Sequence, residues 1–229
     1  MAEGKAAFVL GATGAVGRKF VEVLAADPRY SRVVLLGRRI VDQPDAPAKI
    51  EQRVIDFEKL EDHRSDFEGF DVGFCALGTT RGKSGVKGQY RVDHDYVVDS
   101  AKLAKDNGTK TFCLVSSSGA NENSMFFYPK TKGETERDLK TIGFEHLVIA
   151  RPAFLEGPRD EFRLGEAVAK IFVKPFKLLT SSIAIDTIDV ARALVSAASN
   201  PSADPVRLID NKELIDIAKE YKEAAQQKN

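Results

Sequence analysis

The amino-acid sequence predicts an α/β fold with a doubly wound parallel sheet of the Rossmann type. Two features indicate it: short apolar runs alternate with helical stretches, and the first apolar run passes directly into a glycine-rich turn. The chain has 229 residues, of which 43% are hydrophobic, enough for one sizeable core. We therefore expect a single nucleotide-binding domain over residues 1–229 with a small C-terminal substrate lobe, in which residues 152–185 form a lid region.

Strands and helices are expected in alternation along the chain. Apolar runs predict strands at residues 7–10, 32–36, 53–56, 72–77, 111–116, 146–150 and 206–209. Amphipathic stretches predict helices at residues 15–26, 92–105, 129–139, 165–172, 188–198 and 212–225. Asn107-Gly108 suits the end of the second helix, and Pro129 suits the first position of the third.

Two segments, residues 79–91 and 152–182, fit no regular element. The first leaves the carboxyl end of the fourth strand, which is the edge where open α/β sheets bind ligands, so we expect a ligand-binding loop there. The second is expected to be a substrate lid, with an ordinary crossover connection as the alternative.

The balance of charge argues against several kinds of partner. The 34 Lys and Arg residues equal the 34 Asp and Glu residues, and no long run of one sign occurs, so nucleic acid is not expected as a ligand. No run approaches the roughly 18 apolar residues of a membrane span, and the first ten residues lack a secretory signal. Cys75, Cys113 and three scattered histidines indicate neither disulfide nor metal site. A cytoplasmic protein is expected.

The strongest motif lies between the first strand and the first helix. It reads Gly11-Ala12-Thr13-Gly14-Ala15-Val16-Gly17. Gly11 permits the sharp turn, Gly14 lets the backbone approach a pyrophosphate, and Gly17 lets the helix pack against the sheet. The helix start adds unpaired N–H donors and positive dipole. This motif predicts a dinucleotide cofactor, with a purely structural turn as the alternative.

The ends of the next three strands indicate which dinucleotide binds. Arg38 and Arg39 stand where a carboxylate would select NAD, and paired guanidiniums suit the 2′-phosphate of NADP(H), although they could also be a solvated basic pair. After the third strand, Asp56 is placed to accept from the adenine amino group and Phe57 to pack on the ring edge, while a simple turn is the alternative. The fourth strand ends in Leu77-Gly78-Thr79, where Gly78 lets the backbone pass beside the cofactor.

A tyrosine and a lysine indicate carbonyl chemistry. Hydride transfer to a carbonyl needs a proton donor, and Tyr128 can serve if Lys132, four residues later, makes it more acidic. Ser117 or Ser118, which follow the fifth strand, would orient the carbonyl. Lys132 would also hold the nicotinamide ribose, so that Tyr128 and Lys132 are expected to contact the cofactor as well. The alternatives are a strand-end cap for the serines and a solvated helix face for Lys132.

Together these motifs resemble the short-chain dehydrogenase/reductase superfamily, of which the chain looks like an atypical, short member. Residues 73–83 (GFCALGTTRGK) and 92–97 (VDHDYV) resemble more narrowly its TIP30 group. The resemblance implies NADPH binding, a cofactor-site role for Arg151 and protein partners among nuclear import receptors and transcription factors, with a nuclear location besides the cytoplasm. The chain carries Asp93 where many relatives place an asparagine of a proton relay.

These observations lead to two functional hypotheses. The first is an NADPH-dependent oxidoreductase that reduces a small carbonyl or enone substrate by Ser-Tyr-Lys chemistry. The second is an NADPH-binding regulatory protein that acts through protein partners with little or no turnover.

Overall fold

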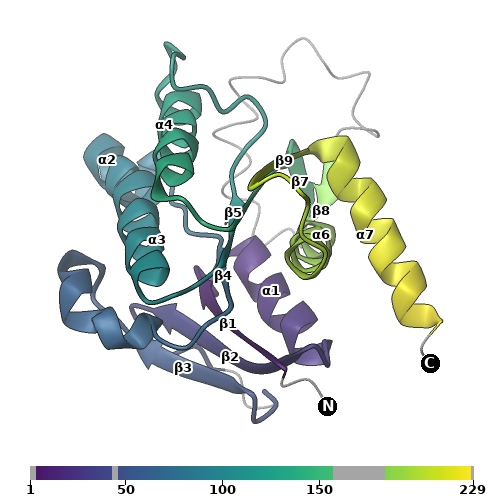
Figure 1. Cartoon of the computed structure of the whole chain (residues 1–229). Helices are drawn as coiled ribbons and strands as arrows, with labels where there is room; N and C mark the ends of the chain where they lie inside the picture. Colours follow the sequence, from purple (N-terminus) through teal and green to yellow (C-terminus); the bar gives the residue numbers. More distant parts are fainter. Residues whose placement is uncertain (1–3, 43–45, 157–183, 228–229) are drawn as a thin grey trace.

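A parallel sheet of seven strands forms the centre of the molecule (Figure 1). The computed structural model describes residues 4–42, 46–156 and 184–227. Within them the strand order is β3-β2-β1-β4-β5-β6-β9, and every pairing is parallel. The strands are β1 (Lys5–Leu10), β2 (Tyr30–Gly37), β3 (Ile50–Val54), β4 (Val72–Cys75), β5 (Thr111–Val115), β6 (His146–Arg151) and β9 (Val206–Asp210). The predicted doubly wound parallel sheet is confirmed.

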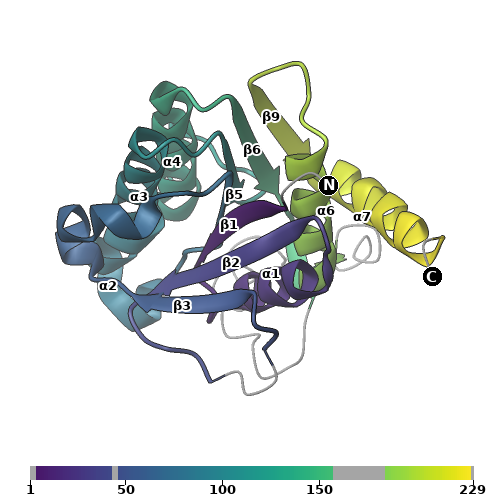
Figure 2. The same cartoon turned by 60° about the horizontal axis from the view of Figure 1, so that its bottom comes forward.

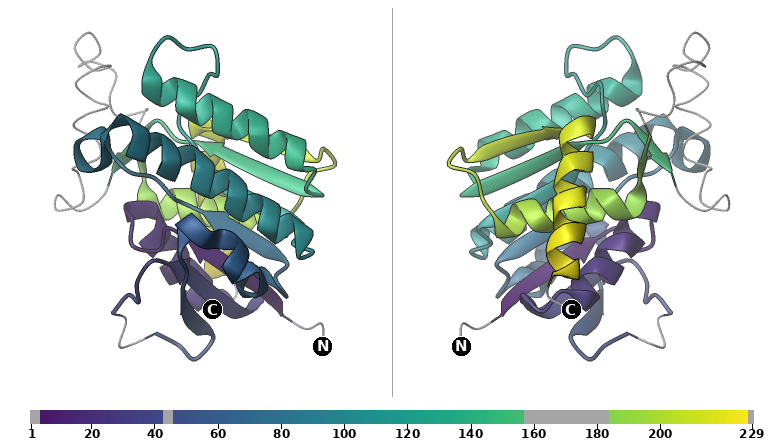
Figure 3. Two further views of the ribbon diagram at one scale, coloured as in Figure 1. Left: turned by 90° about the vertical axis from the view of Figure 1, so that its left-hand side faces the viewer. Right: turned by 90° about the vertical axis from the view of Figure 1, so that its right-hand side faces the viewer.

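Helices cover both faces of this sheet (Figures 1 and 2). One face carries α1 (Ala15–Ala26) and α6 (Thr187–Ser199), with α7 (Asn211–Gln226) packed outside α6. The other face carries the 3₁₀ segment η1 (Phe57–Phe67), α3 (Tyr96–Asp106) and α4 (Phe127–Ile142). The two side views of Figure 3 show α3 and α4 on one side and α7 crossing α6 on the other.

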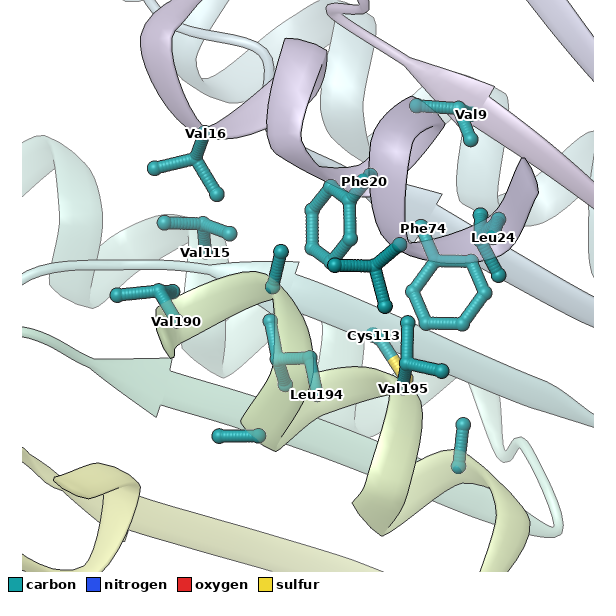
Figure 4. Close-up of a cluster of buried hydrophobic side chains, with 14 of the residues drawn as sticks. Val9, Val16, Phe20, Leu24, Phe74, Cys113, Val115, Val190, Leu194 and Val195 are labelled. Atoms are coloured by element: carbon teal, nitrogen blue, oxygen red, sulfur yellow. The ribbon is translucent and has the colours of Figure 1, made fainter. Parts of the chain in front are cut away.

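The core is divided by the sheet into two apolar layers. Along β1, Ala7 and Val9 belong to the layer beneath α1 and α6, whereas Phe8 and Leu10 belong to the layer beneath η1, α3 and α4. This alternation is the period of a strand that is buried on both faces. In the first layer, shown in Figure 4, Phe20 of α1 meets Phe74 of β4 with ring centroids 5.1 Å apart.

The predicted loop at residues 79–91 is wrong for most of its length. The chain forms α2 (Arg81–Tyr90), passes through one π turn, η2 (Arg91–Asp95), and continues as α3. The three glycines of α2 have low helix propensity, which hid the helix from a sequence reading. The backbone of Gly85 is not helical, since its φ is positive at 68°, so α2 is interrupted in the middle.

Other elements were missed or lie outside the described residues. The segment η1 was not predicted, because its polar residues give it only a weak apolar face. A small parallel pair was not predicted either: β7 (Phe154–Glu156) and β8 (Ala184–Asp186) lie at the two ends of the expected lid. The helix predicted at 165–172, and most of the lid region 152–185, lie outside the described residues.

A buried carboxylate fastens the C-terminal helix to the start of the sheet. Asp27 ends α1, and its carboxylate accepts hydrogen bonds from Arg29 Nε at 2.9 Å and from Tyr221 Oη of α7 at 3.2 Å. Burial raises the pKa of this carboxyl, but the hydrogen bonds and charge of Arg29 lower it by more, so the net pKa lies below its ordinary value. Ionised Asp27 therefore stabilises the folded chain.

We expect Asp27→Asn to lower the free energy of unfolding by about 2 kcal/mol, the worth of a hydrogen bond to a charged group. Because the folded pKa is depressed, this contribution is complete above the ordinary aspartate pKa of about 3.9 and is lost as the pH falls through the folded value. Denaturant unfolding of both proteins from neutral to acidic pH measures this. Asp99→Asn is the control, because Asp99 is an exposed carboxylate whose ion-pair partner within the described residues is Lys102. A difference in stability that stays constant down to the lowest pH would contradict the assignment.

Candidate functional site

The candidate site lies where the strand order reverses, between the carboxyl ends of β1 and β4. Here the chain turns from β1 into α1 by backbone contacts that leave no room for side chains. Gly11 has a positive φ of 83°, and a Cβ on it would lie 2.6 Å from the carbonyl oxygen of Ala76. A Cβ on Gly17 would lie 1.9 Å from the carbonyl oxygen of Gly11. Protein packing alone accounts for both glycines.

Packing does not account for Gly14. Its φ of −83° is open to any residue, and the nearest protein atom to a Cβ there would be the Gly11 oxygen at 3.4 Å. Gly14 caps α1, whose first turn holds no acidic residue and whose first amides have no partner within the helix. A bare backbone beside a positive helix end fits the pyrophosphate of a dinucleotide. Within the same motif Ala12 and Val16 are buried, whereas Thr13 is exposed.

Arg38 and Arg39 follow the end of β2 at Gly37 and are both exposed. In the described part of the chain neither is paired with a carboxylate, whereas two other arginines nearby are. Arg32 Nε lies 2.8 Å from Glu51, and Arg53 Nη1 lies 3.2 Å from Asp66. Among the described residues, no carboxylate therefore pairs with these two guanidiniums at the ligand edge.

The structure separates the roles expected for Asp56 and Phe57. Asp56 is exposed and caps η1 by accepting from the amide of Glu58 at 2.9 Å. Phe57 is buried, and its ring stacks on Tyr96 with centroids 5.0 Å apart. The ring of Phe57 is thus part of the core, and its expected contact with the edge of the adenine remains a prediction, as does the acceptor role of Asp56.

Arg151 pairs with a buried carboxylate. Its Nε donates to the Glu136 carboxylate at 3.0 Å, and the Ser116 hydroxyl donates to the same carboxylate at 2.6 Å. Glu136 is buried, so its charge requires these partners. The structure thus gives Arg151 a structural contact between β6 and α4, and its expected role at the cofactor site remains a prediction.

Tyr128 and Lys132 lie one turn apart near the start of α4. Lys132 is buried, with its side chain 5% exposed, and its Nζ lies 5.9 Å from the centre of the Tyr128 ring. Tyr128 is half-buried. Burial of Lys132 excludes the solvated helix face that was the alternative for this residue.

The two candidate serines lie in the segment that follows β5. Ser117 is partly exposed, and its hydroxyl donates to the carbonyl oxygen of Ser118 at 3.2 Å. Ser118 is exposed, and its amide donates to the carbonyl of Pro152 at 2.9 Å. Among the described residues neither serine is hydrogen-bonded to Tyr128, so the structure brings together the tyrosine and lysine but not the whole expected set.

Asp93 is a site residue to which the sequence assigned no role. It lies on η2 with its side chain 1% exposed, and Oδ2 is 3.7 Å from Lys132 Nζ. Its Oδ1 accepts from the amide of Thr79 at 2.7 Å. Gly78, beside Thr79, is exposed, and a Cβ on Gly78 would lie 3.8 Å from Asp93 Oδ1. The available signal was the resemblance, in which many relatives carry an asparagine at this position.

The two buried charges affect each other's ionisation. Burial lowers the pKa of the Lys132 ammonium, but the Asp93 carboxylate and Tyr128 raise it by more, so the net pKa lies above its ordinary value. Burial raises the pKa of the Asp93 carboxyl, and Lys132 and the Thr79 amide oppose only part of this rise. Lys132 is therefore an ammonium at neutral pH.

We expect Gly14→Ala to keep the fold and to weaken binding of a nicotinamide dinucleotide at least tenfold, or about 1.4 kcal/mol, because its methyl group would occupy the pyrophosphate position. Thermal unfolding and calorimetric titration with the dinucleotide measure the two effects. Gly17→Ala is the contrast, since its methyl would overlap the Gly11 carbonyl and lower the melting temperature. Unchanged affinity in Gly14→Ala would show that the turn does not carry the pyrophosphate.

Comparison with known proteins bears out the resemblance seen in the sequence. The chain matches the NAD(P)H-binding family over residues 11–201. Protein HTATIP2 of Rattus norvegicus is 38% identical over 220 residues, which cover 95% of this chain and 91% of that protein. HTATIP2 is another name for TIP30, after which the group is named. Protein FMP52, mitochondrial, of Candida albicans is 36% identical over 222 residues, covering 92% and 97% respectively.

The fungal relatives overturn the expected cytoplasmic or nuclear location. Protein fmp52 of Emericella nidulans, 37% identical over 76% of this chain, is also named mitochondrial. The expectation rested on few cysteines and no secretory signal, which do not distinguish the cytoplasm from other reducing compartments. Across residues 4–42, 46–156 and 184–227, none of the helices combines the length and apolar character that crossing a membrane requires.

Solved structures share the fold at low sequence identity. MoeE5 in complex with UDP-glucose and NAD has a TM-score of 0.69 at 16% identity, covering 94% of this chain and 81% of that one. A UDP-galactose 4-epimerase has a TM-score of 0.67 at 16% identity, covering 89% and 76%. This chain has the glycine turn and the parallel sheet of such proteins, and it matches the family model over residues 11–201. It therefore belongs to the NAD(P)H-binding family of Rossmann-fold proteins.

Proposed function

We propose that the protein is an NADPH-dependent reductase of a small carbonyl or enone substrate. The observation that carries this proposal is the pairing of Tyr128 with the buried ammonium of Lys132 on α4. Carbonyl reduction requires a proton donor, and a phenol beside a buried cation can serve, because the cation would stabilise the phenolate that remains. The nicotinamide cofactor of the family supplies the other half of the chemistry.

When bound, NADPH supplies a hydride to the carbonyl carbon of the substrate. Tyr128 Oη then gives its proton to the carbonyl oxygen, so that an alcohol forms and a phenolate remains. The Lys132 ammonium stabilises that phenolate until it regains a proton from solvent. Ser117, with Ser118 as the second candidate, would hold the carbonyl oxygen by its hydroxyl.

The cofactor itself would be held by the residues at the sheet edge. The Gly11 to Gly17 turn and the start of α1 would bind the pyrophosphate, Asp56 the adenine, and the backbone from Leu77 to Thr79 the nicotinamide side. Arg38 and Arg39 favour the phosphorylated cofactor, because their guanidiniums are exposed at the end of β2 and have no carboxylate partner among the described residues.

Replacing Arg38 and Arg39 together by alanine should weaken NADPH binding by about 2 kcal/mol or more, close to thirtyfold, while NADH binding changes little. The reason is that only NADPH carries the 2′-phosphate. Titration of both cofactors by calorimetry measures this. Arg32→Ala and Arg53→Ala are controls, since both arginines already pair with carboxylates. Equal weakening of NADPH and NADH would refute the assignment.

Tyr128→Phe should lower the rate of NADPH consumption at least about 100-fold with a responsive aldehyde, ketone, quinone or enone, because it removes the proton donor. NADPH affinity should stay nearly unchanged. Absorbance of NADPH measures the rate across a panel of such carbonyls. Tyr90→Phe is the matched control, since its ring stacks on His94 and phenylalanine preserves that contact.

Two outcomes would count against the reductase. Full turnover in Tyr128→Phe would remove Tyr128 as the proton donor. Bound NADP(H) in the purified protein, with no turnover of any carbonyl, would favour an NADPH-binding regulatory protein that acts through partners, among which the resemblance suggests import receptors and transcription factors.

A further inference from the structure

The carboxylate of Asp93 lies in an unusual position, between the segment after β4 and the start of α4. Oδ1 accepts from the amide of Thr79 at 2.7 Å, and Oδ2 lies 3.7 Å from Lys132 Nζ. The backbone carbonyl of Asp93 also accepts from the Thr135 hydroxyl of α4 at 3.0 Å. Side chain and backbone of one residue thus attach η2 to the same helix.

Asp93 is presented by a single π turn, η2 (Arg91–Asp95), between two α-helical segments. Such an insertion is costly in a helix and is frequent at functional sites, because it redirects one side chain. Here the redirected side chain is a carboxylate that is 1% exposed. A buried carboxylate without a cation would cost several kcal/mol, so the position of Asp93 depends on Lys132.

We propose that Asp93 is a positioning residue that keeps Lys132 charged in its buried site and couples this charge to the Thr79 segment. The inference deepens the proposed function, since Lys132 is the residue that would stabilise the Tyr128 phenolate. The asparagine found in many relatives could accept the same Thr79 hydrogen bond but could not balance the ammonium.

Among the groups that face Lys132, Asp93 is the one that balances its charge. Asp93 approaches from η2, Tyr128 from α4 and Cys75 from β4. Burial raises the pKa of the Cys75 thiol to about 12, so the thiol is neutral at physiological pH. Within the described residues, Asp93 is the carboxylate within ion-pair distance of Lys132.

The pair also has a consequence for catalysis. The Asp93 carboxylate prevents burial from removing the lysine proton. Lys132 therefore stays charged beside Tyr128 over a wide pH range.

The test follows the ionisation of Lys132 in the full chain without cofactor or substrate. The protein is labelled with ¹³C at the lysine ε carbon, and the Lys132 resonance is assigned by its absence in Lys132→Arg. In Asp93→Asn we expect the titration midpoint of Lys132 to fall by about 1 to 3 pH units, the effect of losing an opposite charge at this distance. Asp99→Asn, an exposed carboxylate on α3, should leave it unchanged. An unchanged midpoint in Asp93→Asn would overturn the proposal.

A second variant tests the same pair from its other side, should Asp93→Asn fail to fold. In Lys132→Gln the Asp93 carboxyl, followed by a ¹³C label on aspartate, should titrate about 1 to 3 units higher because burial is no longer opposed by the ammonium. The same midpoint with and without Lys132 would show that the two charges are not coupled. Neither titration depends on turnover, so a protein that passes these tests but reduces no carbonyl would lose the proposed function and keep this inference.

Discussion

The approach of α1 to the turn that precedes it is the constraint on which the nucleotide site depends. A Cβ on Gly17 would lie 1.9 Å from the Gly11 carbonyl oxygen, so the helix can start at this place only because the residue has no side chain. This contact aims the first amides of α1 across the end of the sheet, where the strand order reverses. The bare backbone at Gly14 then faces the ligand side, and the positive helix end serves an anion.

Charges buried at the same edge of the sheet are organised in pairs. Lys132 and Asp93 form one pair, and Glu136 with Arg151 and Ser116 forms another, four residues further along α4. Each ionised group in a low-dielectric interior needs a partner, and α4 supplies one member of both pairs. A helix held in this way on its sheet-facing side can present Tyr128 with little freedom of movement. Rigid support of this kind is what a proton donor needs.

Much of this fold could be predicted from the sequence, and the failures have identifiable causes. The strands were visible because buried parallel strands are short, continuous apolar runs, as in Phe74 and its neighbours on β4. The helix α2 was missed because glycines such as Gly85 lower intrinsic propensity, whereas neighbouring segments decide the local outcome. The polar segment η1 was missed because it buries few side chains, among them Phe57.

Chain order was enough to place Gly11, Gly14 and Gly17 between a strand and a helix, and Tyr128 one turn before Lys132, because such patterns are local. The partners of Lys132 and Arg151 are not local: Asp93 is 39 positions from the lysine, and Glu136 lies on a different element from the arginine. Only packing of η2 and β6 against α4 brings these charges together. Burial then decides which ionic groups must pair, and burial is a property of the folded chain.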